Sequence, residues 1–410
     1  MTSRERVLAA FEHLQPDRVP VDFSAHRSSG IMAVAYARLK DYLGIASGDV
    51  YVYDIIQQLA IVEPPVLERF GVDAVEMGRG FALSEDYWRD WVLPDGTPCK
   101  VPAFLNLKRK GGDWFICAED GTALAVQRKG CLYFEQLTWP LAESDEQRFA
   151  DLAPLLGRCM WTAIGTPPAP IGFDKAGCEE LRRGAVALRR ATDRAIVGLF
   201  GGNLHEMAQF LFRIDNALAL LAADPRRAHR FLDKVVEMHM ANLEKFLGAV
   251  GDSIDVILFG DDLGMQTGPQ ISRRMYDEFY RDRHAALWQR AKELADVRVM
   301  LHCCGGVYEL MPSLIEAGLD AINPVQISAA GMEPQRLKRE FGRDMVFWGG
   351  GCDTRRVLPE GTPAEVREHV RRMVEALSPE GGFVFQQVHN IMADVPPRNI
   401  VAMFDAVNAS

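Results

Sequence analysis

Short apolar runs alternate with longer segments of helical periodicity over most of the chain. Strands buried in a parallel sheet are short, β-branched apolar runs, whereas helices carry apolar residues three to four positions apart. The alternation is most regular after residue 195, and two earlier runs fit the same pattern. The predicted strands are 19–23, 73–76, 195–200, 254–259, 297–301, 321–323, 345–348 and 383–386.

Eight strands alternating with helices are typical of a parallel (β/α)8 barrel, which we expect as a single domain over residues 1–410. An open doubly wound sheet is the second choice. It is disfavoured because the first strand–helix turn lacks a Gly-x-Gly-x-x-Gly sequence. The expected helices, of which the first starts at a capping box of Thr2 and Glu5, are 3–14, 31–44, most of 54–70, 144–158, 174–192, 204–222 (with 225–250 as its successor), 272–294, 307–317, 333–341, 363–377 and 397–408.

Residues 84–140 depart from this alternation. Short aromatic and β-branched runs are separated there by Asp95-Gly96, Gly111-Gly112 and Asp120-Gly121, which are typical hairpin turns. We therefore expect an antiparallel, β-rich insertion after the second strand, inside the barrel domain because no linker flanks it. Its expected roles are to cover the mouth of an active site, to set substrate choice, or to join two copies of the chain as a homodimer.

The composition narrows the classes of function. Of the 410 residues, 48% are hydrophobic and 25% are charged, and the net charge is −10 at pH 7. Without a basic excess to neutralise phosphates, a nucleic-acid partner is not expected. No apolar run approaches the roughly 18–20 residues that span a bilayer, and the N-terminus does not resemble a signal peptide. We therefore expect a cytoplasmic protein without membrane contact, whose eight cysteines are reduced.

Polar side chains gather just after the predicted strands. In a (β/α)8 barrel the carboxyl ends of all strands meet at one face, where the loops carry the chemistry. We assign to catalysis Asp261, Asp262 and His389, and to substrate binding His26, Asn203, Glu206, Gln326 and Asn390.

The strongest chemical signal is a histidine and two cysteines at the ends of the fifth and seventh strands. His302 and Cys304 follow one apolar run, and Cys352 follows three glycines after the other. Zinc prefers imidazole and thiolate, and three protein ligands with an open fourth position are typical of a catalytic site. Because side chains alternate along extended backbone, residues 302 and 304 should point together and Cys303 away. The alternatives are buried thiols or a redox-active thiol pair.

The two acids after the fourth strand and the late histidine each allow two interpretations. Asp261 and Asp262 can exchange protons with a substrate, hold a cationic substrate, or orient a metal-bound histidine. They can equally cap the helix that follows. His389 is either a substrate-positioning group or a satisfied core histidine. Zinc with two thiolates and one neutral imidazole would carry no net charge, which suits a bound thiol or a leaving oxygen better than hydroxide.

Several motifs, in their order and spacing, resemble the uroporphyrinogen decarboxylase superfamily over nearly the whole chain. They are Pro16-Asp-Arg-Val-Pro20, Gly260-Asp-Asp-Leu-Gly264, Gly268-Pro-Gln-Ile-Ser272, His302-x-Cys304-Gly305, Asn323-Pro-Val-Gln326, His389-Asn-Ile and Pro396-Pro-Arg-Asn-Ile400. The resemblance implies a distorted (β/α)8 barrel, which agrees with the pattern of strands.

Within that superfamily the chain is similar to the corrinoid-dependent methyltransferases rather than to the decarboxylases. The decarboxylases grip the carboxylates of a tetrapyrrole with an arginine-rich N-terminal segment, and the matching stretch here, 21–27, has one arginine. In the methyltransferases a His-x-Cys and a later Cys bind zinc, which implies His302, Cys304 and Cys352. Such enzymes move a methyl group between a small molecule (methanol, a methylamine, a methoxylated aromatic compound or a thiol) and the cobalt of a corrinoid (cobalamin) cofactor.

The resemblance therefore implies a zinc-dependent methyltransferase. It would work with a separate corrinoid protein, because the chain lacks the Asp-x-His-x-x-Gly corrinoid signature. Zinc would activate the acceptor thiol or the leaving group, while Asp261 or Asp262, with His389, would position the substrate. A decarboxylase or lyase acting on a carboxylated substrate is the alternative. A non-catalytic barrel with a closed, four-ligand structural zinc is the third hypothesis.

Overall fold

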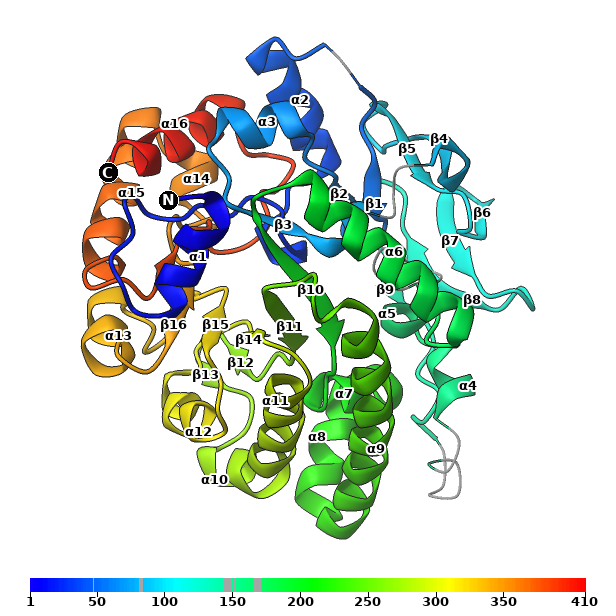
Figure 1. Ribbon diagram of the computed structural model, residues 1–410. Coiled ribbons are helices and arrows are strands. Elements are labelled where there is room, and N and C mark those ends of the chain that lie inside the picture. Colours follow the sequence, from blue (N-terminus) through cyan, green and yellow to red (C-terminus); the bar gives the residue numbers. More distant parts are fainter. Residues whose placement is uncertain (47, 81–83, 144–148, 150–151, 165–170) are drawn as a thin grey trace.

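A ring of parallel strands forms the centre of the protein (Figure 1). The computed structural model describes residues 1–46, 48–80, 84–143, 149, 152–164 and 171–410. Seven strands pair in the order β17 (Phe383–Val384), β16 (Val346–Trp348), β15 (Ala321–Asn323), β14 (Arg298–His302), β11 (Val256–Gly260), β10 (Ala195–Gly201) and β3 (Ala74–Glu76).

Residues 21 and 22 close this ring. Val21 pairs in parallel with Phe385, and Asp22 pairs in parallel with Ala74, so the two edge strands of the sheet are joined. The backbone N–H of Asp22 donates to the carbonyl of Phe385 at 2.8 Å, and that of Asp73 donates to Val21 at 2.7 Å. The first predicted strand is thus reduced to a two-residue bridge, and the predicted distorted (β/α)8 barrel is confirmed.

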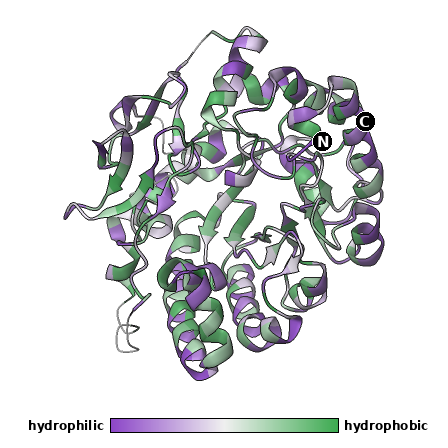
Figure 2. Ribbon diagram, turned by 180° about the vertical axis from the view of Figure 1, so that it is seen from behind, coloured by the Kyte–Doolittle hydropathy of each residue, from purple (hydrophilic) through white to green (hydrophobic). Residues whose placement is uncertain are grey.

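Strand residues alternate between the inside of the ring and the layer beneath the helices. The inner cluster joins α1 (Ser3–Phe11), which closes the amino-terminal end of the barrel, to Val197, Val256, Leu258, Met300, Val346 and Trp348. The intervening residues Ile196, Ile257, Val299, Leu301, Ile322 and Phe347 belong to the larger core beneath the helices. We call this second layer the outer shell, and Figure 2 shows the apolar strands at the centre of the molecule.

Helices follow the strands and cover the outside of the ring (Figure 1). The longest, α9 (Pro225–Val250), begins at Asp224, whose side chain accepts from the backbone N–H of Arg227. The predicted helix 204–222 is split at Arg213, which has a φ of +75°. The other helices are α2 (Ala33–Leu43), α4 (Ala153–Leu156), α5 (Met160–Ala163), α6 (Lys175–Ala191), α7 (His205–Phe212), α8 (Ile214–Ala223), α10 (Arg273–Tyr276), α11 (Asp282–Leu294), α12 (Met311–Glu316), α13 (Pro334–Phe341), α14 (Val357–Glu360), α15 (Pro363–Leu377) and α16 (Pro397–Asn408).

The predicted helix over most of 54–70 is wrong. The structure has an antiparallel pair there, β1 (Val52–Asp54) with β2 (Leu59–Ala60), and only then the short helix α3 (Pro64–Arg69). The Asp54 side chain accepts from the backbone N–H of Gln57 at 2.9 Å, which favours a turn over a helix. Two prolines at the start of α3 suit a first helical turn but not a helix interior. Of the predicted helix 144–158, residues 144–148 and 150–151 lie outside the described residues.

The segment from 84 to 140 is antiparallel, as expected. β4 (Trp88–Val92) pairs with β5 (Pro98–Pro102), and a second sheet contains β6 (Leu107–Lys110), β7 (Asp113–Cys117), β8 (Ala123–Gln127) and β9 (Glu135–Gln136). The glycines of the three predicted turns all have positive φ, for example +91° at Gly96 and +87° at Gly121. Glycine adopts this conformation without a steric penalty, which is why these turns could be read from the sequence.

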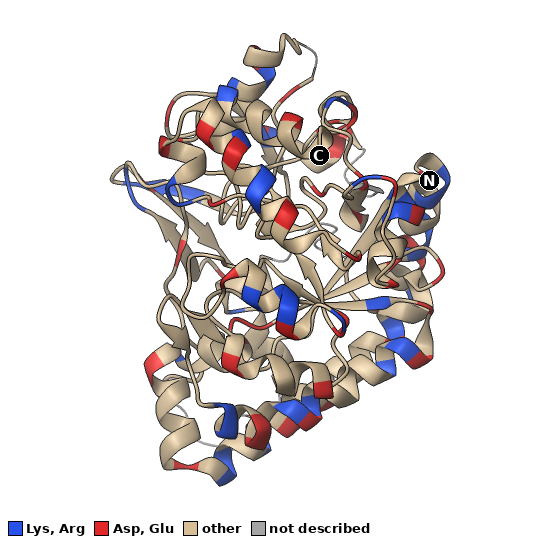
Figure 3. Cartoon of the chain, turned by 90° about the vertical axis from the view of Figure 1, so that its left-hand side faces the viewer, with Lys and Arg blue, Asp and Glu red and all other residues tan. Residues whose placement is uncertain are grey.

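Charged residues lie on the outer helices. Figure 3 shows Lys and Arg interspersed with Asp and Glu along the helices that face the viewer. Among the described residues, no helix is both long enough and apolar enough to cross a bilayer.

Candidate metal centre and active site

A cavity of about 670 Å³ opens at the carboxyl ends of the barrel strands. The last residues of β10, β11 and β14 line it, together with loops after β3 and β17 and one face of α9. Six of the residues assigned from the sequence lie on its wall, namely His26, Asn203, Glu206, Asp262, His302 and His389.

The end of β14 presents two potential metal ligands to the same side. Nε2 of His302 and Sγ of Cys304 are 3.4 Å apart. Cys303, between them, is buried in the outer shell, where its sulfur accepts from the backbone N–H of Leu263 at 3.3 Å. The expected alternation of side chains along extended backbone is therefore what the structure shows.

His389, from the loop after β17, completes the cluster. One ligand atom from each of His302, Cys304 and His389 lies within 4.8 Å of the others. The two imidazole rings meet edge to face, with centroids 5.8 Å apart and planes at 60°. This is the one group of three or more potential ligands found in the part of the chain that the structure describes.

Cys352 does not join this cluster, although the sequence analysis placed it there. The Cys352 side chain is fully buried in the outer shell, and the Cys352 backbone pairs in parallel with that of Gln387. The reason lies in the glycines before it. Gly349 has a φ of +120° and lies so close to the Pro324 carbonyl that a Cβ would be 2.1 Å from that oxygen. The chain therefore turns after β16 in a way that period-two alternation does not describe.

An asparagine orients each imidazole of the cluster. Nδ2 of Asn323 donates to the Trp348 carbonyl and to Gln386, so its Oδ1 must be the atom that lies 2.8 Å from Nδ1 of His302. That nitrogen therefore carries the proton, and Nε2 keeps its lone pair toward Cys304.

The same arrangement holds for the second imidazole. Nδ2 of Asn390 donates to Gln57 at 2.9 Å, which leaves its Oδ1 to accept from Nδ1 of His389. Burial lowers the pKa of both histidines, to about 4 for His389. Two neutral imidazoles with free Nε2 atoms are the form in which histidine binds a metal.

The two neighbouring acids have different surroundings. Asp261 is fully buried and accepts from the backbone N–H groups of Leu204, His205 and Glu206, and from His284. Burial alone would raise its pKa, but the His284 and backbone hydrogen bonds outweigh burial and lower it. Asp261 therefore caps the start of α7, a helix that precedes it in the chain, and not the helix that follows it.

Asp262, in contrast, faces the cavity. Its Oδ1 accepts from the backbone N–H of Cys304 at 2.8 Å and lies 3.7 Å from Nε2 of His302. The Asp262 carboxylate therefore holds the turn that carries Cys304, and its negative charge would stabilise a cation bound at His302 and Cys304.

Glu206 lies on the wall beside Asp262. Its Oε2 accepts from Nδ2 of Asn203 at 2.7 Å. Burial, followed by the negative charges of Asp262 and Asp261, raises the pKa of Glu206 well above its usual range. This shift favours the carboxylic acid, which is the form that can donate a proton.

The remaining assigned residues mostly support the site. Oε1 of Gln326 accepts from the backbone N–H of Gly305 at 2.8 Å and so holds the turn after Cys304. It is not among the described residues that line the cavity, and neither is Asn390, which orients His389. His26 lines the cavity, with its Nε2 3.2 Å from Oδ2 of Asp22.

Several residues that line the cavity were not predicted from the sequence. Arg27 is the one Lys or Arg among the described lining residues, and its Nε lies 2.6 Å from Oδ2 of Asp54. His239 and Asn242 reach the cavity from α9. The available signal was a pair of polar residues, three positions apart, on the otherwise apolar face of a long helix.

Comparisons with known proteins agree with this architecture. A parallel barrel whose chemical groups gather at the carboxyl ends of its strands indicates an enzyme. The family model of "Uroporphyrinogen decarboxylase (URO-D)" matches residues 185–410, more than half of the chain. The protein therefore belongs to the URO-D family.

Its curated relatives are distant. A uroporphyrinogen decarboxylase of Alkalilimnicola ehrlichii is 26% identical over 190 residues, 46% of this chain and 49% of that protein, so the chain matches about half the length of that relative. A uroporphyrinogen decarboxylase of Pectobacterium atrosepticum is 23% identical over 286 residues, 68% of this chain and 73% of that protein. A solved structure, a methyltransferase from Methanosarcina mazei, is 16% identical with a TM-score of 0.59 and covers 100% of this chain and 99% of its own. The two proteins share a fold.

Proposed function

We propose that this protein is a zinc-dependent methyltransferase that moves a methyl group between a small methylated substrate and a corrinoid (cobalamin) held by a separate protein. The observation that carries the proposal is the convergence of His302, Cys304 and His389, of which the two histidines line the cavity. The fold shared with the methyltransferase from Methanosarcina mazei supports it.

The three side chains fit zinc. Ligands bound at roughly 2.0 and 2.3 Å in tetrahedral geometry lie about 3.5 Å apart, and the separation of His302 and Cys304 is 3.4 Å. Imidazole and thiolate are the donors that zinc prefers, and three protein ligands leave a fourth position for a reactant. With His389 as the third ligand, the centre would carry one positive charge, and when bound it would supply a Lewis acid to a leaving oxygen.

The protein's own residues prepare that site. Asn323 and Asn390 hold the two imidazoles in the tautomer with a free Nε2. Asp262 fixes the backbone at Cys304. Glu206 lies on the cavity wall with its Oε2 held by Asn203, and its raised pKa favours the protonated form that can donate. A neutral acid beside a departing alkoxide would protonate it.

A decarboxylase acting on a carboxylated tetrapyrrole is the less favoured alternative. Several carboxylates entering the cavity would need cationic partners, because buried, unpaired charges are strongly disfavoured. Arg27 is the one cation among the described lining residues, and it is already paired with Asp54. The carboxylate of Asp262 would repel such a substrate further.

A purely structural zinc is also disfavoured. Structural sites are closed by four ligands, whereas His302 and His389 lie on the wall of an open cavity.

The eight cysteines are unpaired in the structure, as in proteins of reducing compartments, and we therefore place the protein in the cytoplasm as part of the proposal.

The test is metal analysis of the purified protein, combined with an assay for methyl transfer from candidate donors to free cob(I)alamin. We expect about one zinc per chain, and loss of methyl transfer on chelation without loss of the fold. Cys304→Ala and His389→Ala should lose the metal, whereas Cys352→Ala is the matched control that should keep it. Protein without zinc, or zinc unaffected by the first two changes, would overturn the proposal.

A further inference from the structure

The cavity extends well beyond the metal cluster. Past the ends of β10 and β11 its wall is formed by aromatic side chains from several elements, namely Trp161, Phe173, Phe200, Phe210, Phe246 and Phe259. Phe200 packs edge-on against Phe259 with ring centroids 5.4 Å apart, and Trp161 stacks near Phe210 at 6.0 Å. Such a chamber favours a flat aromatic group, because stacked and edge-to-face aromatic pairs are more stable than the burial of their surface area alone would make them.

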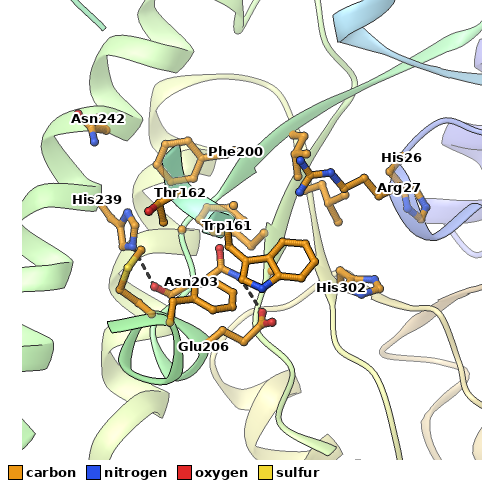
Figure 4. A pocket seen from close by; sticks show the side chains of 18 of the residues that line it. His26, Arg27, Trp161, Thr162, Phe200, Asn203, Glu206, His239, Asn242 and His302 are labelled. Carbon is orange, nitrogen blue, oxygen red and sulfur yellow. Dashed lines mark hydrogen bonds between the residues drawn. The ribbon is translucent and has the colours of Figure 1, made fainter. Parts of the chain in front are cut away.

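Two polar side chains stand at the far side of this chamber. His239 and Asn242 lie three residues apart on the face of α9 that lines the cavity. Figure 4 shows them on the opposite side from Arg27, His26 and His302, with Phe200 and Trp161 between the two groups. A molecule that reaches from the metal cluster to α9 must therefore cross the aromatic chamber.

Both side chains have unused hydrogen-bonding capacity. His239 is buried, and its Nε2 donates to the carbonyl of Asn203 at 2.9 Å, so Nδ1 keeps a lone pair. Among the described residues, Nδ1 of His239 and the side-chain amide of Asn242 have no hydrogen-bond partner. His239 is buried and Asn242 is half-buried, and both line the cavity, so a polar ligand group there can satisfy the acceptor and the amide together.

The charged residues that line the cavity disfavour an anionic ligand group at the α9 end. Arg27 stands at the metal end and is paired with Asp54 at 2.6 Å. The described lining residues include no other Lys or Arg, and Glu206 and Asp262 are acids. A carboxylate or phosphate at the α9 end would thus be buried without a cation, whereas a hydroxyl would donate to His239 and accept from Asn242.

We propose that the site takes an uncharged aromatic methyl ether, with its ring in the Trp161–Phe200 chamber and a distal hydroxyl bound by His239 and Asn242. The identity of the transferred group rests on the proposed function, but the preference for an uncharged, hydroxylated ring rests on the cavity alone. The volume of about 670 Å³ accommodates one or two rings. His239 and Asn242 are then specificity-determining residues.

The test is equilibrium binding to the purified full-length protein, followed by calorimetry. The probes are 4-methoxyphenol, methoxybenzene and 4-methoxybenzoate, together with their two-ring analogues, in which the hydroxyl, hydrogen or carboxylate sits on a second phenyl ring. In the better-fitting size, we expect the hydroxyl compound to bind at least tenfold more tightly than the carboxylate, since one uncompensated charge costs well over the free energy of a tenfold change. Equal or tighter binding of the carboxylate would overturn the proposal.

Variants at the α9 end make the test specific. Asn242→Leu should weaken binding of the hydroxyl compound about fivefold to tenfold and leave the compound without a hydroxyl unchanged. Asn242→Lys should raise the affinity for the carboxylate, a gain that an unfolded variant cannot produce. The proposal would be overturned if Asn242→Leu weakened binding of both uncharged probes equally, or if Asn242→Lys did not raise the affinity for the carboxylate. Either result would show that α9 does not contact the distal group of the ligand.

These outcomes separate this inference from the proposed function. Binding requires neither methyl transfer nor zinc loading at the His302 end. A protein that binds the hydroxyl probe but transfers no methyl group would retain the substrate class and lose the reaction. A zinc-dependent methyltransferase without preference among the probes would retain the reaction and lose this inference.

Discussion

The mouth of the barrel and the outer shell hold residues that are neighbours in the sequence but differ in chemistry. We define the mouth group as Asp262, His302 and His389, which line the cavity, together with Cys304, whose sulfur lies beside His302. The shell group is Asp261, Cys303 and Cys352, which lie beneath the helices. Asp261 and Asp262 are adjacent, as are Cys303 and Cys304, yet in each pair one member caps or packs and the other belongs to the mouth group.

Residue type alone therefore does not mark a functional site in this fold. The Cys352 thiol packs in the shell, whereas the Cys304 thiol lies beside potential metal ligands. Burial nevertheless raises the pKa of both thiols. What separates them is whether partners with free lone pairs converge on the same point. Substitutions in the mouth should therefore change metal affinity, and substitutions in the shell should change stability.

The largest expected effect concerns the ligands. Cys304→Ala and His389→Ala should each lower zinc affinity by at least about 100-fold. Removing a metal ligand costs more affinity than removing a residue that only hydrogen-bonds to a ligand. Competition with a chromophoric chelator measures this. Cys352→Ala, the shell counterpart, should bind zinc like the unaltered protein. If Cys352→Ala loses zinc instead, the division into mouth and shell is broken.

The next effect concerns the buried acid of the shell. Asp261→Ala should lower the free energy of unfolding by about 3 kcal/mol, because it leaves buried N–H groups at the start of α7 and His284 without their acceptor. Urea denaturation measures it, with Asp262→Ala as the neighbouring control that should cost about 1 kcal/mol or less.

The pH dependence of that difference has a definite sign. Because the folded-state pKa of Asp261 is lowered, its contribution is fully present above the unfolded-state pKa of about 3.9 and is lost as the pH falls through the folded-state value. The stability gap between the unaltered protein and Asp261→Ala should thus be constant from pH 7 to 5 and close below about pH 4. A gap that persists unchanged in acid would assign the effect to packing alone.

A smaller effect concerns the asparagines that orient the imidazoles. Asn390→Ala should lower zinc affinity by about 10- to 100-fold, since it frees His389 to rotate and to take the other tautomer. The matched control is Cys303→Ala, which alters the residue beside a ligand but lies in the shell. Unchanged affinity in Asn390→Ala would mean that the tautomer is set elsewhere.

The smallest effect is a count of protons. Burial raises the pKa of the Cys304 thiol and lowers that of both histidines, so at pH 6 the thiol is protonated and the imidazole of His389 is neutral. Zinc binding should then release about one proton, from Cys304. Calorimetry in buffers of different ionisation enthalpy measures this number. Release of about two would point to a second thiol, and therefore to Cys352.

The sequence predicted the barrel well because its signals are local. Each strand from 195 onward is a short apolar run, and the structure places strands at all of these positions. The turn glycines of the insertion behave the same way, since positive φ at Gly96 or Gly121 is a property of the residue itself. The failure at 54–70 is also local, because the Asp54 side chain competes with helix formation through its own turn.

The site was predicted only as far as local alternation reaches. That residues 302 and 304 point together follows from extended backbone, and the structure agrees. The third member could not be chosen this way, because both Cys352 and His389 follow strand ends through irregular turns. The close approach of Gly349 to the Pro324 carbonyl, a contact between two neighbouring strands, sends Cys352 into the shell.

The amino-acid sequence by itself therefore determined the strand count, the β-rich insertion and the pairing of His302 with Cys304, since each depends on residues a few positions apart. Only the tertiary structure decided that His389 meets them, that Asp261 caps a helix while Asp262 faces the cavity, and that His239 and Asn242 stand across an aromatic chamber. These relations join segments many tens of residues apart, and they depend on how the strands pair in the ring.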